Sequence, residues 1–405
     1  MNYEVNKCPI TDSELRFEYL DLGLQPIVNN LNNNIEESLT CPKYPLAIQL
    51  FEESKLSSLT YEIDPKILYE YYLYKSGTSQ PYIEHCREMF EFVNYYLHLD
   101  ESDLVLDIGG NDGTLLTTFK QIIPSLNVIN IDASYNLTIE SNLKGIPSIC
   151  GFWGTDLAKQ VNKKFELITT TNCFQHTAYI NDFVEAIKMS LTPRGIWCLE
   201  FPYWKNSLET NQFDQIYHEH IYYYLLSPLK LLLDKHGLEI IKAVPYPIHG
   251  GTLRILIAHK GTWTPCNSVE QTLEKEKFEK EDYIAWGKRM KEHIIKSRDF
   301  LLGLKSQGYK IAGFGAAAKG CIYLNAMGIN YEQIDYIIDD TDIKQNKFMP
   351  GLGIEVLNRE ILKTTNPDYI LILAHNFADY IMGSLRKDGY KGKFILLIPE
   401  IKECE

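Results

Sequence analysis

The sequence has 405 residues, of which 45% are hydrophobic and 23% are charged, a composition typical of a globular protein with room for two or three domains. Its 40 Lys and Arg residues against 53 Asp and Glu residues give a net charge of −13, which argues against nucleic acid as a partner. No apolar run approaches membrane-spanning length and the chain does not open with a secretory signal pattern, so we expect no membrane association and a cytoplasmic location.

The first 60 residues contain short apolar pieces between turn residues and show no strong chemical motif. The following stretch, 61–82, is rich in tyrosine and includes Tyr72, Ser76 and Ser79. Tyrosines this close together can cover a ligand, but sequence alone favours a packing patch with polar edges. Residues 83–100 are predicted to form a helix that leads into an α/β domain.

A glycine-rich turn organises the rest of the chain. An apolar run ends there in Asp107-x-Gly109-x-Asn111-x-Gly113, and a helical pattern follows. A strand that enters a helix through glycines lets a ligand approach the backbone, and the first N–H groups of the helix are unpaired. A dinucleotide fingerprint would need glycine at positions 109, 111 and 114, but the chain has Asn111 and Thr114, so that interpretation fails on spacing.

The second apolar run of this unit, residues 126–131, ends in Asp132. An acidic side chain at the end of the second strand can accept hydrogen bonds from both hydroxyls of a ribose. An acidic residue inside the first turn suits a cationic ligand better than a pyrophosphate. The two strands together therefore predict a site for S-adenosylmethionine, whose sulfonium is positive. The alternative is a glycine turn that only packs a helix on the sheet.

Residues 104–200 alternate strand and helix patterns, which predicts a doubly wound parallel sheet with strands at 104–108, 127–131, 165–170 and 195–200. Ligands bind beyond the carboxyl ends of such strands. The residues that follow the third and fourth strands should therefore border the same crevice as the glycine turn; they are Asn172, His176, Glu200, Phe201 and Pro202. A lone histidine is usually structural, and only its position beside the cofactor strand makes His176 a candidate.

The most unusual polar run of the chain contains Tyr217, His218, Glu219, His220 and Tyr222. Metal binding is disfavoured here, because no cysteine or histidine at zinc spacing completes a ligand set. A structural role for the histidines is the commonest outcome. The third interpretation is acid–base catalysis, in which a histidine accepts a proton, a carboxylate orients it and tyrosine hydroxyls bond a developing oxyanion. Methylation at carbon needs both a base and such a donor.

Residues 239–258 are predicted as two strands around His249, two glycines and Arg254, whose guanidinium can face a diphosphate or a surface carboxylate. From Ser268 to about Leu304 the pattern is long, charged and helical, which indicates a connection between domains.

The C-terminal part begins with Gly313-x-Gly315-x-x-Ala318 and Lys319 after a strand pattern, and Asp339 ends the next strand pattern. This arrangement fits a dinucleotide fingerprint, so a nicotinamide-dependent oxidoreductase is the rival hypothesis. The same helix N-terminus can instead take the diphosphate of a nucleotide-linked substrate. Either interpretation predicts a second, smaller α/β domain.

Five motifs in this order resemble those of the sugar-nucleotide C-methyltransferases over nearly the whole chain: Val105 to Gly113, Tyr217 to His220, His249 to Arg254, Gly313 to Gly320 and Lys344 to Gly351. The resemblance implies an α/β fold, with a class I methyltransferase Rossmann-like domain between a small N-terminal domain and a C-terminal Rossmann-like domain that holds the substrate. The implied bounds are 1–65 for the N-terminal domain, 66–265 for the methyltransferase domain, 266–305 for a connecting helix and 306–405 for the C-terminal domain.

The resemblance also implies the reaction: methyl transfer from S-adenosylmethionine to the carbon beside the ketone of a nucleoside-diphosphate 4-keto-deoxysugar, usually C3. His220 matches the family's base, and Tyr217, Glu219 and His176 match groups around the sugar. The expected cofactor-binding residues are Asp107, Gly109, Asn111, Gly113, Asp132, Asn172, Tyr72, Ser76 and Ser79. The expected substrate-binding residues are Glu200, Phe201, Pro202, Tyr222, His249, Arg254 and Lys319.

The chain departs from the family's pattern at one place. Members usually carry two Cys-x-x-Cys pairs that bind zinc in the N-terminal domain, whereas here only Cys8 of the first pair remains and Cys41 lies too early to replace the second. We therefore predict that this domain binds no zinc and is held by its apolar core.

Three alternatives to carbon methylation stay open at this point. They are methylation of oxygen or nitrogen on a related nucleotide-sugar, nicotinamide-dependent oxidation, and binding of a nucleotide-sugar without catalysis. We expect a monomer or a homodimer whose partner is a small molecule.

Overall fold

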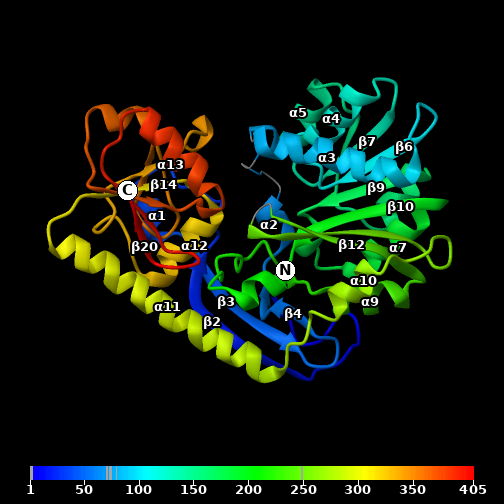
Figure 1. Cartoon of the computed structure of the whole chain (residues 1–405), viewed down its shortest axis with the longest axis horizontal. Helices are drawn as coiled ribbons and strands as arrows, with labels where there is room; N and C mark the ends of the chain where they lie inside the picture. Colours follow the sequence, from blue (N-terminus) through cyan, green and yellow to red (C-terminus); the bar gives the residue numbers. More distant parts are fainter. Residues whose placement is uncertain (1–2, 70–71, 73–74, 79, 248–249) are drawn as a thin grey trace.

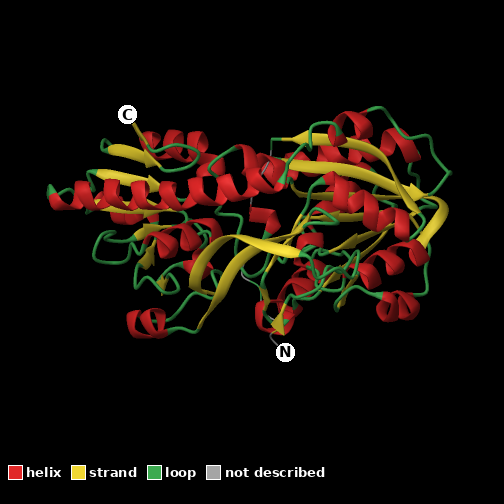
Figure 2. Ribbon diagram, turned by 90° about the horizontal axis from the view of Figure 1, so that it is seen from below, coloured by secondary structure: helices red, strands yellow, loops and turns green. Residues whose placement is uncertain are grey.

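The computed structural model describes residues 3–69, 72, 75–78, 80–247 and 250–405. Figure 1 shows two α/β lobes side by side, with the long strands of the N-terminal part below and between them. Helix α11 (Lys280–Ser306) follows the lower edge of the C-terminal lobe, and Figure 2 shows it reaching from that lobe to the middle of the molecule. The central lobe, the C-terminal lobe and the N-terminal strands therefore meet in the middle of the molecule (Figure 1).

The central lobe contains a seven-stranded sheet in the order β12-β13-β10-β9-β6-β7-β8. Neighbours from β10 through β9, β6 and β7 to β8 are parallel, and β13 is antiparallel to both β10 and β12. The strands are β6 (Leu104–Ile108), β7 (Asn127–Asp132), β8 (Ser148–Cys150), β9 (Phe165–Thr171), β10 (Leu191–Pro202), β12 (Leu238–Tyr246) and β13 (Thr252–His259). The predicted parallel strands and class I methyltransferase Rossmann-like fold are confirmed, and the fourth strand begins earlier than its pattern indicated.

Alternation along the strands places helices on both faces of this sheet. Val105 on β6 belongs to the apolar cluster that contains Phe119, whereas the next residue, Leu106, belongs to the cluster on the opposite face with Val184. Successive side chains of a strand point to opposite faces, so a strand that is apolar throughout is buried on both sides. The flanking helices are α3 (Gln80–Leu97), α4 (Thr114–Ile122), α5 (Tyr135–Leu143), α6 (Thr155–Val161), α7 (Ile180–Ser190) and α9 (Leu226–Lys235).

The N-terminal part forms a four-stranded sheet in the order β11-β4-β3-β2. Its strands are β2 (Arg16–Pro26), β3 (Lys43–Phe51), β4 (Leu56–Leu59) and β11 (Tyr222–Tyr223); a small pair, β1 (Tyr3–Glu4) and β5 (Tyr61–Glu62), and helices α1 (Ile35–Thr40) and α2 (Pro65–Tyr69) accompany it. The edge strand β11 comes from the middle of the chain. The N-terminal sheet is thus completed by residues next to the predicted base. A domain boundary at residue 65 leaves β11 in the following domain, although β11 belongs to the same sheet as β2, β3 and β4.

Cys8 lies in the apolar core, where its thiol is 3.1 Å from the hydroxyl of Ser54. Within the described ranges, no three His, Cys, Asp or Glu side chains are grouped as a metal site. The absence of zinc remains a prediction.

The C-terminal lobe contains a second seven-stranded sheet, in the order β16-β17-β15-β14-β18-β19-β20. Its inner strands are parallel, and β16 and β20 are antiparallel edges. The elements are β14 (Ile311–Phe314), α12 (Ala318–Met327), β15 (Ile337–Ile338), β16 (Lys347–Phe348), β17 (Glu355–Leu357), β18 (Tyr369–Ile372), α13 (Ala378–Lys387), β19 (Lys393–Leu396) and β20 (Lys402–Cys404). A smaller Rossmann-like unit was predicted here and is present.

The connection predicted as one helix is two helices, α10 (Ser268–Leu273) and α11. Glu279 starts α11 with a capping box, in which its side chain and that of Asp282 accept each other's backbone N–H groups. This start separates α11 from α10, although the charged pattern of the sequence continues across the break. In the part of the chain that the structure describes, no helix combines the length and the apolar character that crossing a bilayer demands.

Candidate active site

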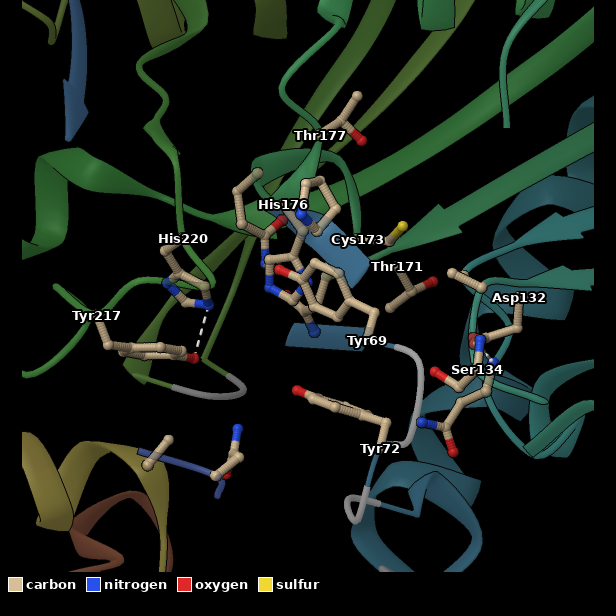
Figure 3. Close-up of a pocket in the computed structure, with 18 of the residues that line it drawn as sticks. Tyr69, Tyr72, Asp132, Ser134, Thr171, Cys173, His176, Thr177, Tyr217 and His220 are labelled. Carbon is tan, nitrogen blue, oxygen red and sulfur yellow. Dashed lines mark hydrogen bonds between the residues drawn. The ribbon is translucent and has the colours of Figure 1, made fainter. Parts of the chain in front are cut away.

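A cavity of about 760 Å³ lies between the carboxyl ends of the central strands, the N-terminal part and the C-terminal lobe. Its size is in the range of pockets that hold small molecules. Figure 3 shows Asp132 and Ser134 at one side of this cavity and Tyr217 and His220 at the other, with tyrosines between them. The predicted cofactor and base residues therefore meet in one space.

Gly109 forms the close approach that the sequence predicted. Its φ is +68°, and its N–H donates to the carbonyl of Ile131 at 2.7 Å. A β-carbon added at Gly109 would lie 2.4 Å from the sulfur of Cys173, which follows β9, so only glycine fits at this position. Gly109 lines the cavity, and it presents backbone atoms there without a side chain.

Asp132 is held in a fixed orientation at the end of β7. One carboxylate oxygen accepts the N–H of Asn111 at 2.9 Å, and the other accepts the N–H of Ser134 at 2.8 Å. Burial raises the pKa of Asp132, while these two backbone donors act in the opposite direction. Asp132, Asn111 and Ser134 all line the cavity.

Two predicted cofactor residues lie behind the turn and do not line the cavity. Asp107 is buried and accepts a hydrogen bond from the hydroxyl of Thr169 at 2.7 Å, and burial raises its pKa to about 7. Gly113 caps α4 with φ +74°, and an added β-carbon would lie 2.3 Å from the hydroxyl oxygen of Ser141. Both residues shape the turn from within.

Two of the expected cofactor-binding residues from the tyrosine-rich stretch line the cavity, and so does Asn172. The N–H of Ser76 donates to the side-chain oxygen of Asn111 at 3.1 Å, and Tyr72 and Ser76 line the cavity. Asn172 lines it too, and its N–H donates to the carbonyl of Glu200 at 2.8 Å. Ser79 and His249 lie outside the described residues.

Four aromatic rings form a column along the cavity wall. The ring centroids of Tyr69 and His176 are 5.5 Å apart, those of His176 and His220 are 5.0 Å apart, and those of His220 and Tyr217 are 4.0 Å apart. The Tyr217 hydroxyl and Nε2 of His220 are 2.6 Å apart, which Figure 3 marks with a dashed line. The column joins three segments that are distant in the sequence.

Burial leaves both histidines of the column uncharged at neutral pH. It lowers the pKa of His176 to about 3. The pKa of His220 is held well below its ordinary value by burial and by the nearby His176 and Lys319. The neutral His220 ring can therefore accept the hydroxyl proton of Tyr217, and it is already in the form that a base requires.

The Glu219 carboxylate ties two parts of the chain together. It accepts the Tyr72 hydroxyl at 2.8 Å and the side-chain amide of Asn29 at 2.7 Å. Burial raises the pKa of Glu219 to about 7, and both hydrogen bonds oppose that rise. Glu219 thus links Tyr72, in the tyrosine-rich stretch, to Asn29 in the N-terminal part.

Four residues predicted to bind substrate lie away from the cavity lining. Glu200 and Arg254 are fully buried and form an ion pair, with Arg254 Nε 2.9 Å from Glu200 Oε2. They are paired across β10 and β13, so Arg254 faces a carboxylate, which is buried and not at the surface, and the expectation that Arg254 binds substrate is wrong. Phe201 belongs to the apolar core and Tyr222 to the N-terminal sheet, whereas Pro202 does line the cavity.

The C-terminal lobe closes the cavity with Lys319, Lys344 and the turn before α12. The turn repeats the geometry of the cofactor turn, because the N–H of Gly315 donates to Ile338 at 2.7 Å and that of Ala316 to Asp339 at 2.8 Å. Here the Lys344 ammonium lies 3.4 Å from the Asp339 carboxylate and donates to the carbonyl of Ala316 at 2.9 Å. A lysine at this place neutralises the acid that a dinucleotide ribose would use, so this turn favours an anion.

Several cavity residues were not singled out by sequence. Cys173 directly follows Asn172, Lys344 opens one of the quoted motifs, and Tyr69 and Tyr82 lie in the tyrosine-rich stretch, so signals for these four were available. Asn29 had none, because nothing in an asparagine-rich loop shows that it will reach a residue 190 positions away.

Comparisons with known proteins cover both lobes. A methyltransferase domain model matches residues 82–243, and a C-methyltransferase C-terminal domain model matches residues 247–399. C-methyltransferase NovU of Streptomyces niveus is 27% identical over 410 residues, which cover 98% of this chain and 96% of that protein.

Solved structures resemble part of the chain. The PH0226 protein of Pyrococcus horikoshii OT3 is 14% identical with a TM-score of 0.38, and the match covers 49% of this chain and 97% of that one. Magnesium protoporphyrin IX methyltransferase of Synechocystis PCC 6803, with bound SAH, is 13% identical with a TM-score of 0.35, over 44% and 85% of the two chains.

The central sheet, its glycine turn and the matching domain model define an S-adenosylmethionine-dependent methyltransferase. The turn fits this cofactor, since Asp132 is oriented at the end of β7 and Gly109 leaves no side chain in the approach. The C-terminal model covers the other lobe, and the chain is similar to a C-methyltransferase, NovU, over nearly its whole length.

Proposed function

We propose that this methyltransferase is a C-methyltransferase that acts on a nucleoside-diphosphate 4-keto-deoxysugar and methylates C3, the carbon beside the ketone. The observation that carries the proposal is a neutral imidazole, His220, paired with the Tyr217 hydroxyl in the same cavity as the cofactor turn. A carbon becomes nucleophilic enough for methylation when it loses a proton, and a neighbouring ketone makes that loss feasible. The site assignments that follow are part of this proposal.

His220 takes the C3 proton at Nε2, and the electron pair of the broken C–H bond moves into an enolate. S-adenosylmethionine, when bound, would supply the electrophilic methyl group: the enolate electron pair would form the new bond between C3 and the methyl carbon, and the carbon–sulfur bond would break so that its electron pair leaves with S-adenosylhomocysteine. As the substrate enters, the Tyr217 hydroxyl turns from Nε2 to the ketone oxygen, where it stabilises the developing negative charge. That charge also raises the proton affinity of His220, which offsets its low pKa.

The nucleotide end of the substrate faces the C-terminal lobe. Lys319 and the N-terminus of α12 line the cavity on this side, and Lys344 offsets the charge of Asp339. Diphosphates bind at such places, because backbone N–H groups and ammonium groups both favour negative charge. A local site of this kind in a chain with a net charge of −13 suits a small anionic substrate better than a nucleic acid.

The test is proton exchange at C3. A thymidine-diphospho-4-keto-deoxysugar is incubated in heavy water with the wild type, with His220→Asn and with the control His218→Asn, with and without S-adenosylmethionine. His218 lies two positions from the base but contacts the carbonyl of Pro45 at 3.2 Å, outside the cavity lining. Mass spectrometry and NMR follow deuterium and the new methyl group.

We expect exchange and C3 methylation with the wild type and with His218→Asn, and a loss of at least about a hundredfold with His220→Asn, which still binds S-adenosylhomocysteine. Full exchange by His220→Asn would remove His220 from the role of base. No exchange and no methylation by a wild type that binds the cofactor would overturn the substrate class.

A further inference from the structure

Glu200 and Arg254, two motif residues that lie outside the cavity lining, meet His85 in the interior of the central lobe. Glu200 Oε1 is 2.7 Å from Nε2 of His85, and Glu200 Oε2 is 2.9 Å from Nε of Arg254. Arg254 Nη2 also lies 3.1 Å from the same ring nitrogen. Glu200 and Arg254 are 0% exposed and His85 is 8% exposed, so water contributes little to their solvation.

The three residues link three elements of the lobe. Glu200 is on β10, Arg254 is opposite it on β13, and His85 is on α3. Tyr246 of β12 covers the group, with its ring centroid 3.9 Å from the guanidinium carbon of Arg254. Glu88, one turn along α3, adds a second carboxylate 3.6 Å from Arg254 and 3.6 Å from Nδ1 of His85.

Buried ions of this kind require one particular geometry. Burial alone would raise the pKa of Glu200, but its hydrogen bond with His85 and the charge of Arg254 bring that pKa below its ordinary value. The carboxylate is therefore ionised, and moving α3 away would leave it with one partner fewer. Such a loss is expensive inside a protein, whereas apolar packing tolerates sliding because it has no direction.

Helix α3 begins shortly after residues 76–78, which approach the glycine turn. Tyr82, in its first turn, lines the cavity, and His85 follows one turn later. Just before the helix, the N–H of Ser76 donates to Asn111 at 3.1 Å and that of Gly77 to Asp112 at 3.2 Å. The rotation and the axial position of α3 therefore decide whether these donors reach the glycine turn.

We propose that the buried group of His85, Glu200 and Arg254 is a positioning network for the cofactor site, which holds α3 where Tyr82 and residues 76–78 cover the glycine turn. The network acts through α3 and does not touch the cofactor. The proposal concerns S-adenosylmethionine alone and is independent of the sugar substrate, so the exchange experiment above and the experiment below can fail separately.

The chain offers a matched control for testing this network. His236 and Glu185 form another histidine–carboxylate pair in the same lobe, with Nδ1 and Oε2 3.1 Å apart, but they join α9 to α7. We would compare His85→Leu with His236→Leu in the full-length protein. The readouts are the Kd of S-adenosylhomocysteine by calorimetry and the hydrogen exchange of the backbone amides at 76 and 77, with circular dichroism as a check on folding.

We expect His85→Leu to raise the Kd about tenfold and to speed exchange at 76 and 77. The apparent Kd rises tenfold when residues 76–78 and Tyr82 are in the binding arrangement about a tenth of the time. His236→Leu should leave both unchanged. His85→Gln, whose amide can still donate to Glu200, should recover most of the affinity. A folded His85→Leu with the wild-type Kd and wild-type exchange would overturn the proposal.

If His85→Leu does not fold, Glu88→Gln replaces it, because the Glu88 side chain is 47% exposed and its loss is tolerable. This variant removes the second carboxylate that faces both His85 and Arg254. We expect a Kd about threefold higher, and an unchanged Kd with unchanged exchange would contradict the network's role.

Discussion

Glu219 shows how a single buried carboxyl group makes stability depend on pH. It is 1% exposed, and burial raises its pKa from 4.5 to about 7. Between these two values the folded protein holds a proton that the unfolded chain has lost. Stability therefore falls as the pH rises through this window, and the full cost is present above pH 7.

Glu219→Gln should remove this dependence, since an amide does not ionise and its oxygen can still accept from Tyr72. We expect the free energy of unfolding to fall between pH 5 and pH 8 by about 2 to 3 kcal/mol less in the variant than in the wild type. Urea unfolding at both pH values measures this difference. Asp107 is intact in both proteins, so its own raised pKa cancels; an identical pH dependence would show that Glu219 is not the responsible group.

The turn from β6 into α4 is the element on which cofactor binding depends. Gly109→Ala must place a β-carbon 2.4 Å from Cys173 while also keeping φ at +68°. The β-carbon of Cys173 would also lie 2.6 Å from the added carbon, and rotation of the thiol does not relieve that contact, so we expect the backbone of the turn to shift. The Kd of S-adenosylhomocysteine should rise by at least about tenfold, which corresponds to about 1.4 kcal/mol.

Gly237→Ala separates the effect of the conformation from the effect of the contact. Gly237 has φ +71° with nothing within 4 Å of an added β-carbon. Both variants bear the strain of alanine in the left-handed region, about 1 kcal/mol, but Gly237 lies before β12 and should leave the Kd unchanged. Equal affinities for the two variants, measured by calorimetry, would contradict the role of the Gly109 contact.

At the scale of the whole molecule, α11 joins the N-terminal sheet to the C-terminal lobe. A β-carbon on Gly287 would lie 1.7 Å from the backbone carbonyl oxygen of Tyr19 on β2, so helix and strand touch through their backbones. Trp286, the neighbour of Gly287, packs its ring 5.9 Å from that of Tyr19. Helix α11 therefore packs directly on the N-terminal sheet as well as on the C-terminal lobe, and is more than a linker.

Gly287→Ala should lower the free energy of unfolding by about 1 to 3 kcal/mol, because a backbone carbonyl cannot rotate away as a side chain can. Gly303→Ala on the same helix has open space around the added carbon and should raise stability by about 0.5 to 1 kcal/mol through helix propensity. Urea unfolding of both variants checks this pair of signs. Stabilisation of the protein by Gly287→Ala would rule out the backbone contact.

Sequence patterns predicted correctly those features that depend on residues close together in the chain. The strand predicted at 104–108 has these bounds in the structure, and Gly109 and Asp132 meet at its end as expected. Both depend on neighbours in sequence or on the regular order of a parallel sheet. Helix boundaries were less predictable, since the continuous charge pattern of 268–304 hides the capping box at Glu279 that starts α11.

Residue order alone was enough to predict the two α/β units, the glycine turn with Asp132 after the next strand, and the resemblance of residues 217–220 to C-methyltransferases. The pairing of Arg254 with Glu200, the contact of Asn29 with Glu219 and the place of β11 in the N-terminal sheet became evident from the folded chain. The physical reason is that a charged side chain is polar in any sequence, whereas its partner is set by which elements pack together, and that packing is decided by the whole chain.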